Sequence, residues 1–322
     1  GCGQKEGTSN VSDSTGTPQQ SGSSGDSEET VTITVATWGN NRNADGEYVD
    51  ELVAKAFMEK YPNIKVNWEL LTENDSNSYM TKVDLALAGG ESFDVISFPT
   101  RADYADRIRR GMLAQLDEFF EAEGKKVTDI YYIDPTIDGK VYGVPWDVKY
   151  SFVMLNKQML DEAGLPVPEP GWTWEDFRQY AKALTKGEGA NKIYGSYFWF
   201  VPSYNYFGIS NAMGQDPFLT MDGKSNMLHP DLKEWIDFVY NDMERTDGSL
   251  YPYIDAKTSN ISYRDLFFQG KIGMLPIGTW MIQEVGSNVD KYPREWVTAF
   301  APVPKWKDYP AGNTTENTGY TC

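Results

Sequence analysis

Two tryptophans of this sequence have close neighbours in the chain whose side chains can form hydrogen bonds. Trp38 is followed shortly by Asn40 and Asn41, and Trp146 directly precedes Asp147. An indole offers a flat apolar face, while amides and carboxylates offer donors and acceptors beside it. Such groups suit the binding of a molecule that has both an apolar face and polar edges. The alternative for Trp38 is simple packing, and for Asp147 it is a salt bridge at a hinge.

Groups that could carry out catalysis are scarce. The single histidine, His229, stands before a helix in HPDL, where we expect it to support the turn rather than act as a base. No G-x-S-x-G, HExxH, P-loop or CxxC motif and no DxDxDG calcium loop is present, although scattered aspartates leave calcium open. Carboxylate pairs for glycoside hydrolysis can be drawn from 47 acidic residues, and that abundance makes any pair uninformative. We therefore expect binding without a cofactor or metal.

Composition narrows the class of protein. A chain of 322 residues, 40% hydrophobic and 14% aromatic, fits two globular lobes. The net charge of -18 argues against nucleic acid as a partner. No apolar run approaches the length of a membrane span. Cys2 and Cys322 stand at opposite ends, so neither a disulfide framework nor a metal motif is indicated.

The first part of the chain alternates predicted strands and helices. The segments VTITVATW, IKVNWEL and FDVISF are rich in apolar or β-branched residues and predict strands. Two amphipathic segments between them predict helices, the second closed by Gly89 and Gly90. This β-α-β-α-β order predicts an α/β lobe. Thr100 follows the third strand and is either a hydroxyl at its end or a helix cap.

The rest of the chain predicts a more helical second lobe. Residues 138–157 predict two strands with Pro145 between them, which we interpret as a crossing between lobes. A helix capped by Thr173 and another after His229 place Trp174 and Trp235 at core spacing. Residues 264–285 predict a helix, a strand, a turn and a second helix.

The segment SYFWFVPSYNYFG is dense in aromatic residues. Trp199 and Tyr204 are candidates for an aromatic platform in the second lobe. An ordinary aromatic core explains several of these residues equally well.

The N-terminal segment predicts a disordered tether over residues 1–30. Residues 3–30 hold one aliphatic residue, Val11, and no aromatic residue, so they cannot bury enough surface to fold. As a flexible coil they would span about 30 Å. A cysteine followed by such a tether resembles the mature start of a bacterial lipoprotein, which makes Cys2 the lipid anchor and Gly1 a remnant of the removed signal. The alternative is a stray thiol in a disordered tail.

From about residue 31 to 322 the order of features resembles the extracellular solute-binding proteins of ABC importers, in the group that carries sugars and oligosaccharides. Any one motif is weak, but nine in the family's order are specific. The resemblance implies the α/β, two-lobed periplasmic-binding-protein-like fold of type II. The motifs are the strand ending TW, EKYPNIKV, SYMTKVDLALAGGESFDVI, GMLAQLDEF, DGKVYGVP, FVMLNKQMLDEAGLPVP, WTWEDFRQYAKALT, IYG and FFQGKIGMLPIGTW.

The resemblance also implies a domain organisation. We expect residues 31–145 with 262–310 to form a discontinuous N-terminal α/β lobe. Residues 146–261 with 311–322 would form the second, more helical lobe. The family continues for roughly a hundred further residues, so we expect the given chain to be a fragment that lacks the C-terminal part of the second lobe.

The resemblance implies a carbohydrate ligand, specifically an oligosaccharide, held in a cleft between the lobes and delivered to the permease subunits of the transporter. Trp280 joins the candidates because GTW resembles a ligand-contacting turn of the family, the alternative being a core tryptophan. We expect a monomer on the extracellular face of the cytoplasmic membrane, in contact with the membrane through its lipid anchor only. The candidate ligand-binding residues are Trp38, Asn40, Asn41, Thr100, Trp146, Asp147, Trp199, Tyr204 and Trp280.

Two other interpretations stay open. One is a secreted carbohydrate-active enzyme that uses paired carboxylates in the same cleft. The other is a ligand other than sugar, such as a polyamine, a phosphate ester or a peptide. Few Arg or Lys residues lie at the candidate positions, which argues against an anionic ligand, whereas the acidic surface leaves a cationic ligand open.

If Trp38 and Trp280 are exposed cleft residues, replacing either by Ala should weaken ligand binding by more than about 1 kcal/mol and leave the stability against unfolding nearly intact.

Overall fold

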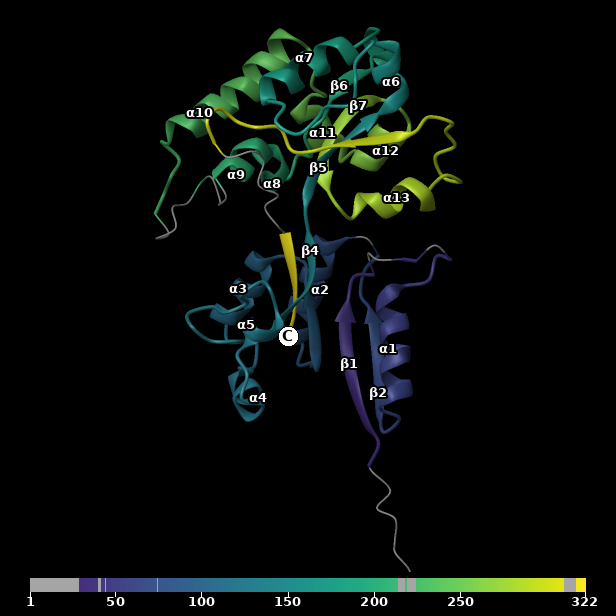
Figure 1. Cartoon of the computed structure of the whole chain (residues 1–322). Coiled ribbons are helices and arrows are strands. Elements are labelled where there is room, and N and C mark those ends of the chain that lie inside the picture. Colours follow the sequence, from purple (N-terminus) through teal and green to yellow (C-terminus); the bar gives the residue numbers. More distant parts are fainter. Residues whose placement is uncertain are drawn as a thin grey trace, which may run out of the picture.

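The chain folds into two lobes, each with its own β-sheet and its own hydrophobic core (Figure 1). The computed structural model describes residues 29–39, 42–43, 45–73, 75–213, 218, 224–309 and 317–322. Residues 1–28 of the predicted tether, which include Cys2, and the candidates Asn40 and Asn41 lie outside the described residues.

The first lobe begins with the predicted alternation of strands and helices. Strand β1 (Val31–Thr37) lies between β2 (Ile64–Leu70) and β3 (Val95–Phe98) and pairs with both in parallel. Parallel neighbours need crossover connections, which α1 (Val49–Lys60) and α2 (Ser76–Ala88) supply. The predicted α/β lobe is therefore confirmed.

The remainder of the first sheet comes from distant parts of the chain. Strand β9 (Asn317–Thr321) inserts between β3 and β4 (Val144–Lys149) and runs antiparallel to both, giving the order β2-β1-β3-β9-β4. The segment between β3 and β4 forms three helices of this lobe, α3 (Arg101–Arg109), α4 (Asp117–Ala122) and α5 (Val127–Ile130).

The second lobe is built on a four-stranded sheet of order β6-β7-β5-β8. Its centre is β7 (Ile272–Gly278), buried at every position, which runs antiparallel to β5 (Ser151–Asn156) and parallel to β6 (Tyr194–Ser196). Strand β8 (Thr298–Ala301) pairs with the other side of β5. Seven buried residues in a row match the near-continuous apolar run of a central strand.

Helices cover this second sheet, as predicted. Trp174 and Trp235 pack edge to face in the core, with ring centroids 5.0 Å apart, so their predicted structural role is confirmed. Thr173 and Asp176 form a capping box at the start of one helix, and His229 caps another by accepting a hydrogen bond from Asp231 N. The helices are α6 (Lys157–Glu162), α7 (Trp174–Leu184), α8 (Pro202–Asn205), α9 (Phe207–Met213), α10 (Pro230–Ile236), α11 (Tyr253–Ser259), α12 (Tyr263–Phe268) and α13 (Met281–Ser287), with a 3-10 turn at Gly189–Asn191 and a π-helix at Asp237–Thr246.

The predicted division of the C-terminal third between the lobes is wrong. Residues 262–310 were assigned to the first lobe, yet β7 and β8 flank β5 in the second sheet. Residues 311–322 were assigned to the second lobe, yet β9 lies in the first sheet. The physical reason is that an apolar run predicts a buried strand but does not specify its partner. Buried β5 needs backbone hydrogen-bond partners along both of its edges, and β7 and β8 provide them.

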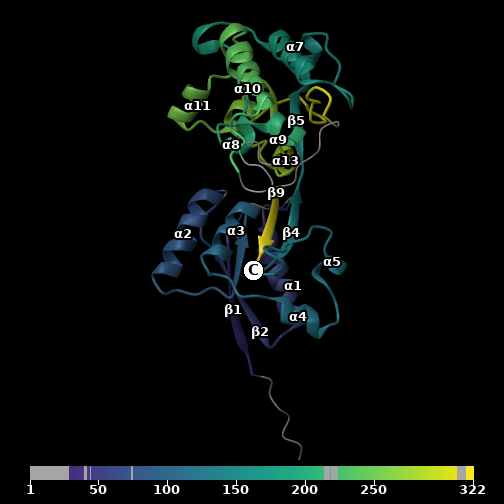
Figure 2. The same ribbon diagram turned by 90° about the vertical axis from the view of Figure 1, so that its left-hand side faces the viewer.

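The two lobes are joined where β4 passes into β5, which confirms the predicted crossing (Figures 1 and 2). Tyr150 lies between these strands and is held to the second lobe by Thr279. Its N–H donates to Thr279 Oγ1 at 3.1 Å, and its carbonyl accepts from Thr279 N at 2.9 Å. No helix among the described residues combines the length and the apolarity needed to cross a bilayer.

Candidate ligand-binding site

Most candidate residues lie on elements where the two lobes face each other. The C-terminal end of β1 points toward the second lobe, and parallel β3 ends on the same side (Figure 1). Helices α8, α9 and α13 form the underside of the second lobe in both views (Figures 1 and 2). In open α/β sheets, ligands bind beyond the carboxyl ends of the strands. The candidate site therefore has a first-lobe part and a second-lobe part.

In the first-lobe part, Trp38 packs between two aromatic rings. Its ring centroid is 5.3 Å from Tyr79 and 5.7 Å from Trp146. The Tyr79 hydroxyl donates to Ala36 O at 2.9 Å and so fixes this packing to β1. Trp38 is only 3% exposed, which contradicts the expectation of an open stacking face. Trp146 is half-buried and is the tryptophan that this part leaves accessible.

Asp147 takes part in an ion pair at the crossing strand. Lys149 Nζ lies 2.6 Å from Asp147 Oδ2 and 5.1 Å from the centre of the Trp146 ring. Burial lowers the pKa of Lys149, and the charge of Asp147 acts in the opposite direction. The structure thus places Asp147 in the hinge salt bridge that was its alternative role.

Asp50 is a member of this part that the sequence pattern did not single out. It lies in the first turn of α1, and Thr37 Oγ1 donates to its Oδ2 at 2.8 Å. Burial raises the pKa of Asp50, and the nearby charge of Asp147 raises it further. An acidic residue in a first helical turn is ordinarily explained by the helix dipole, so its sequence position alone gave no signal. The first-lobe part thus holds two carboxylates, those of Asp50 and Asp147, together with the ammonium group of Lys149 beside the half-buried Trp146.

The second-lobe part brings three candidates together. Trp280 meets Tyr204 edge to face at 5.6 Å, and Trp199 lies 5.3 Å from Tyr204. Tyr263, which the sequence analysis missed, joins them, because Trp280 Nε1 donates to its hydroxyl at 3.2 Å and the Trp199 ring lies 4.8 Å from its ring. Tyr204 is 6% exposed and supports the cluster, whereas Trp199 and Trp280 are half-buried. These two indoles are the accessible surfaces.

The end of β7 leaves room for Trp280. A Cβ at Gly278 would lie 1.9 Å from the Trp280 ring, so a residue with a side chain there would displace the indole. Below the cluster, Arg264 lies 4.8 Å from the centre of the Tyr263 ring and pairs with Glu284 at 2.7 Å. The cationic group is thus neutralised within the protein.

Thr100 caps α3. Its Oγ1 accepts a hydrogen bond from Asp103 N at 3.1 Å and donates to Asp103 Oδ2 at 2.6 Å. The hydroxyl is occupied by this cap, so the structure favours the alternative role given for Thr100.

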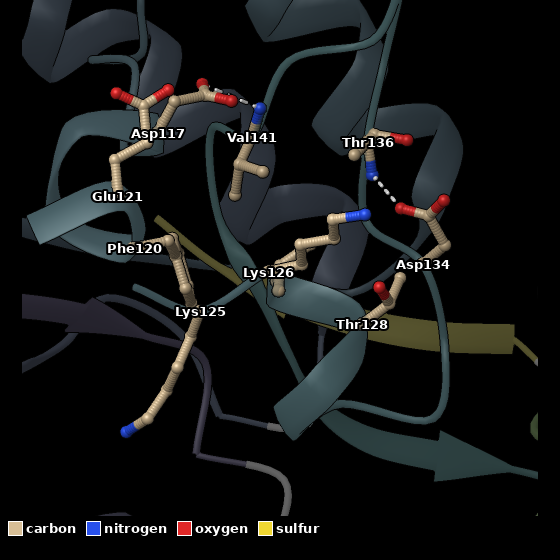
Figure 3. A pocket seen from close by; sticks show the side chains of 10 residues that line it. Asp117, Phe120, Glu121, Lys125, Lys126, Thr128, Asp134, Thr136 and Val141 are labelled. Carbon is tan, nitrogen blue, oxygen red and sulfur yellow. Dashed lines mark hydrogen bonds between the residues drawn. The ribbon is translucent and has the colours of Figure 1, made fainter. Parts of the chain in front are cut away.

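A separate pocket of about 280 Å³ lies in the first lobe among α4, α5 and residues 134–141 (Figure 3). Asp117 accepts from Val141 N at 3.0 Å, and Asp134 accepts from Thr136 N at 2.9 Å. The Lys126 side chain extends toward Thr136 in this view. The pocket contains none of the candidate residues, and its carboxylates serve local backbone structure. Within the described ranges, no group of three His, Cys, Asp or Glu side chains is arranged to hold a metal ion.

Comparison with known proteins identifies the family. Residues 40–321 match the family described as bacterial extracellular solute-binding protein, and the chain belongs to this family. A binding protein of Brucella abortus strain 2308 is 24% identical over 264 residues, which cover 82% of this chain and 61% of the relative. The chain thus spans about three-fifths of the length of this curated relative.

Solved structures show the same fold. A sugar transporter from Rhizobium etli, in an open conformation, has a TM-score of 0.67 and 27% identity, over 91% of this chain and 71% of that chain. An ABC substrate-binding protein from Listeria monocytogenes, in complex with cycloalternan, has a TM-score of 0.70 and 25% identity, over 91% of this chain and 70% of that chain. The predicted periplasmic-binding-protein-like fold and the family resemblance are confirmed.

Proposed function

We propose that this protein is the substrate-binding component of an ABC transporter, which captures an oligosaccharide between its lobes and delivers it to a membrane permease. The observation that carries the proposal is the placement of half-buried tryptophans at the facing ends of both lobes. Trp146 belongs to the first lobe, and Trp199 and Trp280 belong to the second. A ligand between the lobes would meet an indole from each side.

The chemistry of these groups favours a neutral, hydroxyl-rich ligand. The faces of sugar rings carry C–H groups that pack on indoles, and their edges carry hydroxyls that need hydrogen-bond partners. Asp50 and Asp147 supply carboxylate acceptors in the first lobe, where hydrogen bonds to charged groups contribute about 1.5–3 kcal/mol each. Lys149 and Arg264 are each paired with a carboxylate, which disfavours an anionic ligand. The solved relative with bound cycloalternan, a carbohydrate, supports the same ligand class.

The connection between the lobes is suited to opening and closing. Tyr150 passes between the sheets as one residue, held by two hydrogen bonds to Thr279. A few residues at such a junction can absorb the rotation of one lobe against the other. A ligand shifts this equilibrium only by binding more tightly to the closed state, and contact with indoles from both lobes provides that preference.

We further propose that the protein works as a monomer outside the cytoplasmic membrane, tethered through a lipid on Cys2. Each buried acyl methylene contributes about 0.8 kcal/mol to membrane binding, so diacylation gives a durable anchor. The polar residues 3–30 would let the lobes reach the permease while the anchor stays in the bilayer. The protein acts as a receptor and not as an enzyme.

Isothermal titration calorimetry with a panel of neutral oligosaccharides tests this function. Saturable binding with one ligand per chain is expected. Chromatography of the same samples should recover each saccharide intact. Cleavage of the saccharide would overturn the receptor assignment, and the absence of binding across the panel would overturn the ligand class. An organic polyamine, a phosphate ester and a peptide in the panel test the other three ligand chemistries.

A further inference from the structure

The second lobe contains an aromatic pocket that none of the candidate residues lines. Its volume is about 440 Å³, within the range of small-molecule sites. It is formed by the segment around α8, by the π-helix Asp237–Thr246 and by the start of α11. The lining residues are Phe200, Asn205, Tyr206, Phe218, Tyr240 and Tyr253.

We propose that this pocket binds one further neutral sugar ring of the oligosaccharide held between the lobes. The inference rests on the proposed function and adds a subsite to it. The described residues of the lining supply five aromatic rings and one amide, and none of these described residues is charged. This composition matches a ring with apolar faces and uncharged hydroxyls, and it does not match an ion.

The amide of Asn205 supplies the polar contact. Asn205 is 4% exposed, its Oδ1 accepts a hydrogen bond from the Tyr240 hydroxyl, and its backbone carbonyl accepts from Trp235 Nε1 at 3.1 Å. Its Nδ2 is the donor end of the same side-chain amide. An amide N–H donates readily to a hydroxyl oxygen, so Asn205 suits a ligand that carries hydroxyls.

Two tyrosine hydroxyls add to the hydrogen-bonding capacity of the pocket. The Tyr253 hydroxyl accepts from Lys257 Nζ at 3.1 Å, which leaves its own proton available to a ligand. Tyr206 presents a second half-buried hydroxyl and packs edge to face on Phe218 at 4.6 Å. A sugar ring could therefore accept bonds from three directions while it packs on aromatic carbon.

The backbone around Tyr240 departs from an ordinary helix. Asp237–Thr246 is a π-helix, and Asp247 N donates to Asp242 O at 2.8 Å in the five-residue spacing of that conformation. Such segments are rare and are found frequently at functional sites. Val239 and Met243 of this segment stay in the core, while Tyr240 lines the pocket.

One short segment carries both the pocket and the second-lobe part of the candidate site. Trp199 and Tyr204 belong to the aromatic cluster, whereas their neighbours Phe200, Asn205 and Tyr206 line the pocket. Neighbouring Cα atoms are about 3.8 Å apart, so the two features are separated by little more than this backbone. The pocket therefore lies next to the second-lobe part of the candidate site along the chain, which is where a further sugar ring of the same ligand is proposed to bind.

Calorimetry with one linkage series of neutral saccharides, from a single sugar to six units, tests the subsite. In Tyr206→Ala, the dissociation constant for the longest saccharide should rise about fivefold or more, and that for the shortest bound saccharide should stay unchanged. Tyr253→Phe, which removes only a hydroxyl, should weaken binding of the long saccharides in the same sense. Tyr132→Ala, at a fully exposed tyrosine of the first lobe, is the matched control. Thermal melting verifies that each variant is folded.

The outcomes separate this inference from the proposed function. Equal affinities of wild type and both pocket variants at every saccharide length would overturn the subsite and leave the proposed function intact. A loss of affinity by the same factor at every saccharide length would also overturn the subsite, because the pocket would then not distinguish long saccharides from short ones. Failure of the wild-type protein to bind any saccharide would overturn the proposed function itself.

Discussion

The indole of Trp38 meets that of Trp146 edge to face, with ring centroids 5.7 Å apart and planes at 66°. This contact links the end of β1 to the strand that crosses between the lobes. Trp38 is buried and Trp146 is half-buried, so the two tryptophans have different roles. Trp38 holds Trp146 in position, and Trp146 offers the surface to a ligand.

Trp38→Ala should destabilise the protein as a core substitution does. Removing a large buried aromatic side chain costs about 3–5 kcal/mol, because the cavity is only partly refilled. Chemical denaturation followed by circular dichroism measures this loss. If the variant unfolds at the same denaturant concentration as the wild type but binds saccharide weakly, Trp38 is a ligand contact and not a core residue.

Trp280→Ala should reduce saccharide affinity by more than about 1 kcal/mol, because the variant removes an accessible indole of the second-lobe part. Trp296→Ala is the matched control, since Trp296 is also half-buried in the second lobe but packs on Phe267 at 5.4 Å. Calorimetry compares the two affinities. Similar losses of affinity in both variants would assign the effect of Trp280 to general packing.

Thr100→Ala should lower the free energy of unfolding by about 1 kcal/mol, the usual contribution of a helix cap. Saccharide affinity should not change, because the hydroxyl is engaged with Asp103. Thr100→Ser keeps the hydroxyl and should recover most of the stability. A selective loss of affinity in Thr100→Ala would show instead that the hydroxyl contacts the ligand.

Asp50→Asn should raise the melting temperature at pH 7. The folded protein raises the pKa of this carboxyl above its usual value of 3.8, so the folded state binds more protons than the unfolded state between the two pKa values. The contribution of Asp50 to stability therefore falls as pH rises through that window, and ionised Asp50 is unfavourable at pH 7. Asn keeps an acceptor for Thr37 Oγ1 without the charge.

Melting temperatures measured from pH 3 to pH 7 test the sign of this effect. The gain from Asp50→Asn should be largest at neutral pH and should shrink as the pH falls below the raised pKa. A gain that is constant across this range would contradict the assigned titration. Glu51→Gln, in the same helical turn, controls for the removal of one charge.

The sequence predicted local structure well, because local patterns determine it. The alternation in β1 and β2, the cap at Thr173 and the core spacing of Trp174 and Trp235 all depend on nearby residues. The partners of β7 and β9 could not be predicted from the same patterns. Strand pairing joins residues far apart in the chain, and β9 (NTGYT) has little of the apolar alternation that marks a strand.

The candidate site was predictable in composition but not in detail. Trp199, Tyr204 and Trp280 are predicted ligand contacts, and the structure brings their rings together in one cluster. The burial of Trp38 depends on contacts with Tyr79 and Trp146, which lie far from it in the sequence, whereas the cap at Thr100 is local and was one of its two predicted roles. The position of Asp50 near Asp147 joins two distant segments, so no local pattern reveals it.

Small-angle X-ray scattering tests the central claim, that two lobes close on an oligosaccharide, most directly. The radius of gyration is measured for the free protein and for the protein saturated with the tightest-binding saccharide of the panel. The account predicts a smaller radius of gyration for the wild-type protein with ligand than without it. In Trp280→Ala, the radius of gyration should stay unchanged at a saccharide concentration that saturates only the wild type. A radius that stays constant while the saccharide is bound would contradict closure of the lobes on the ligand.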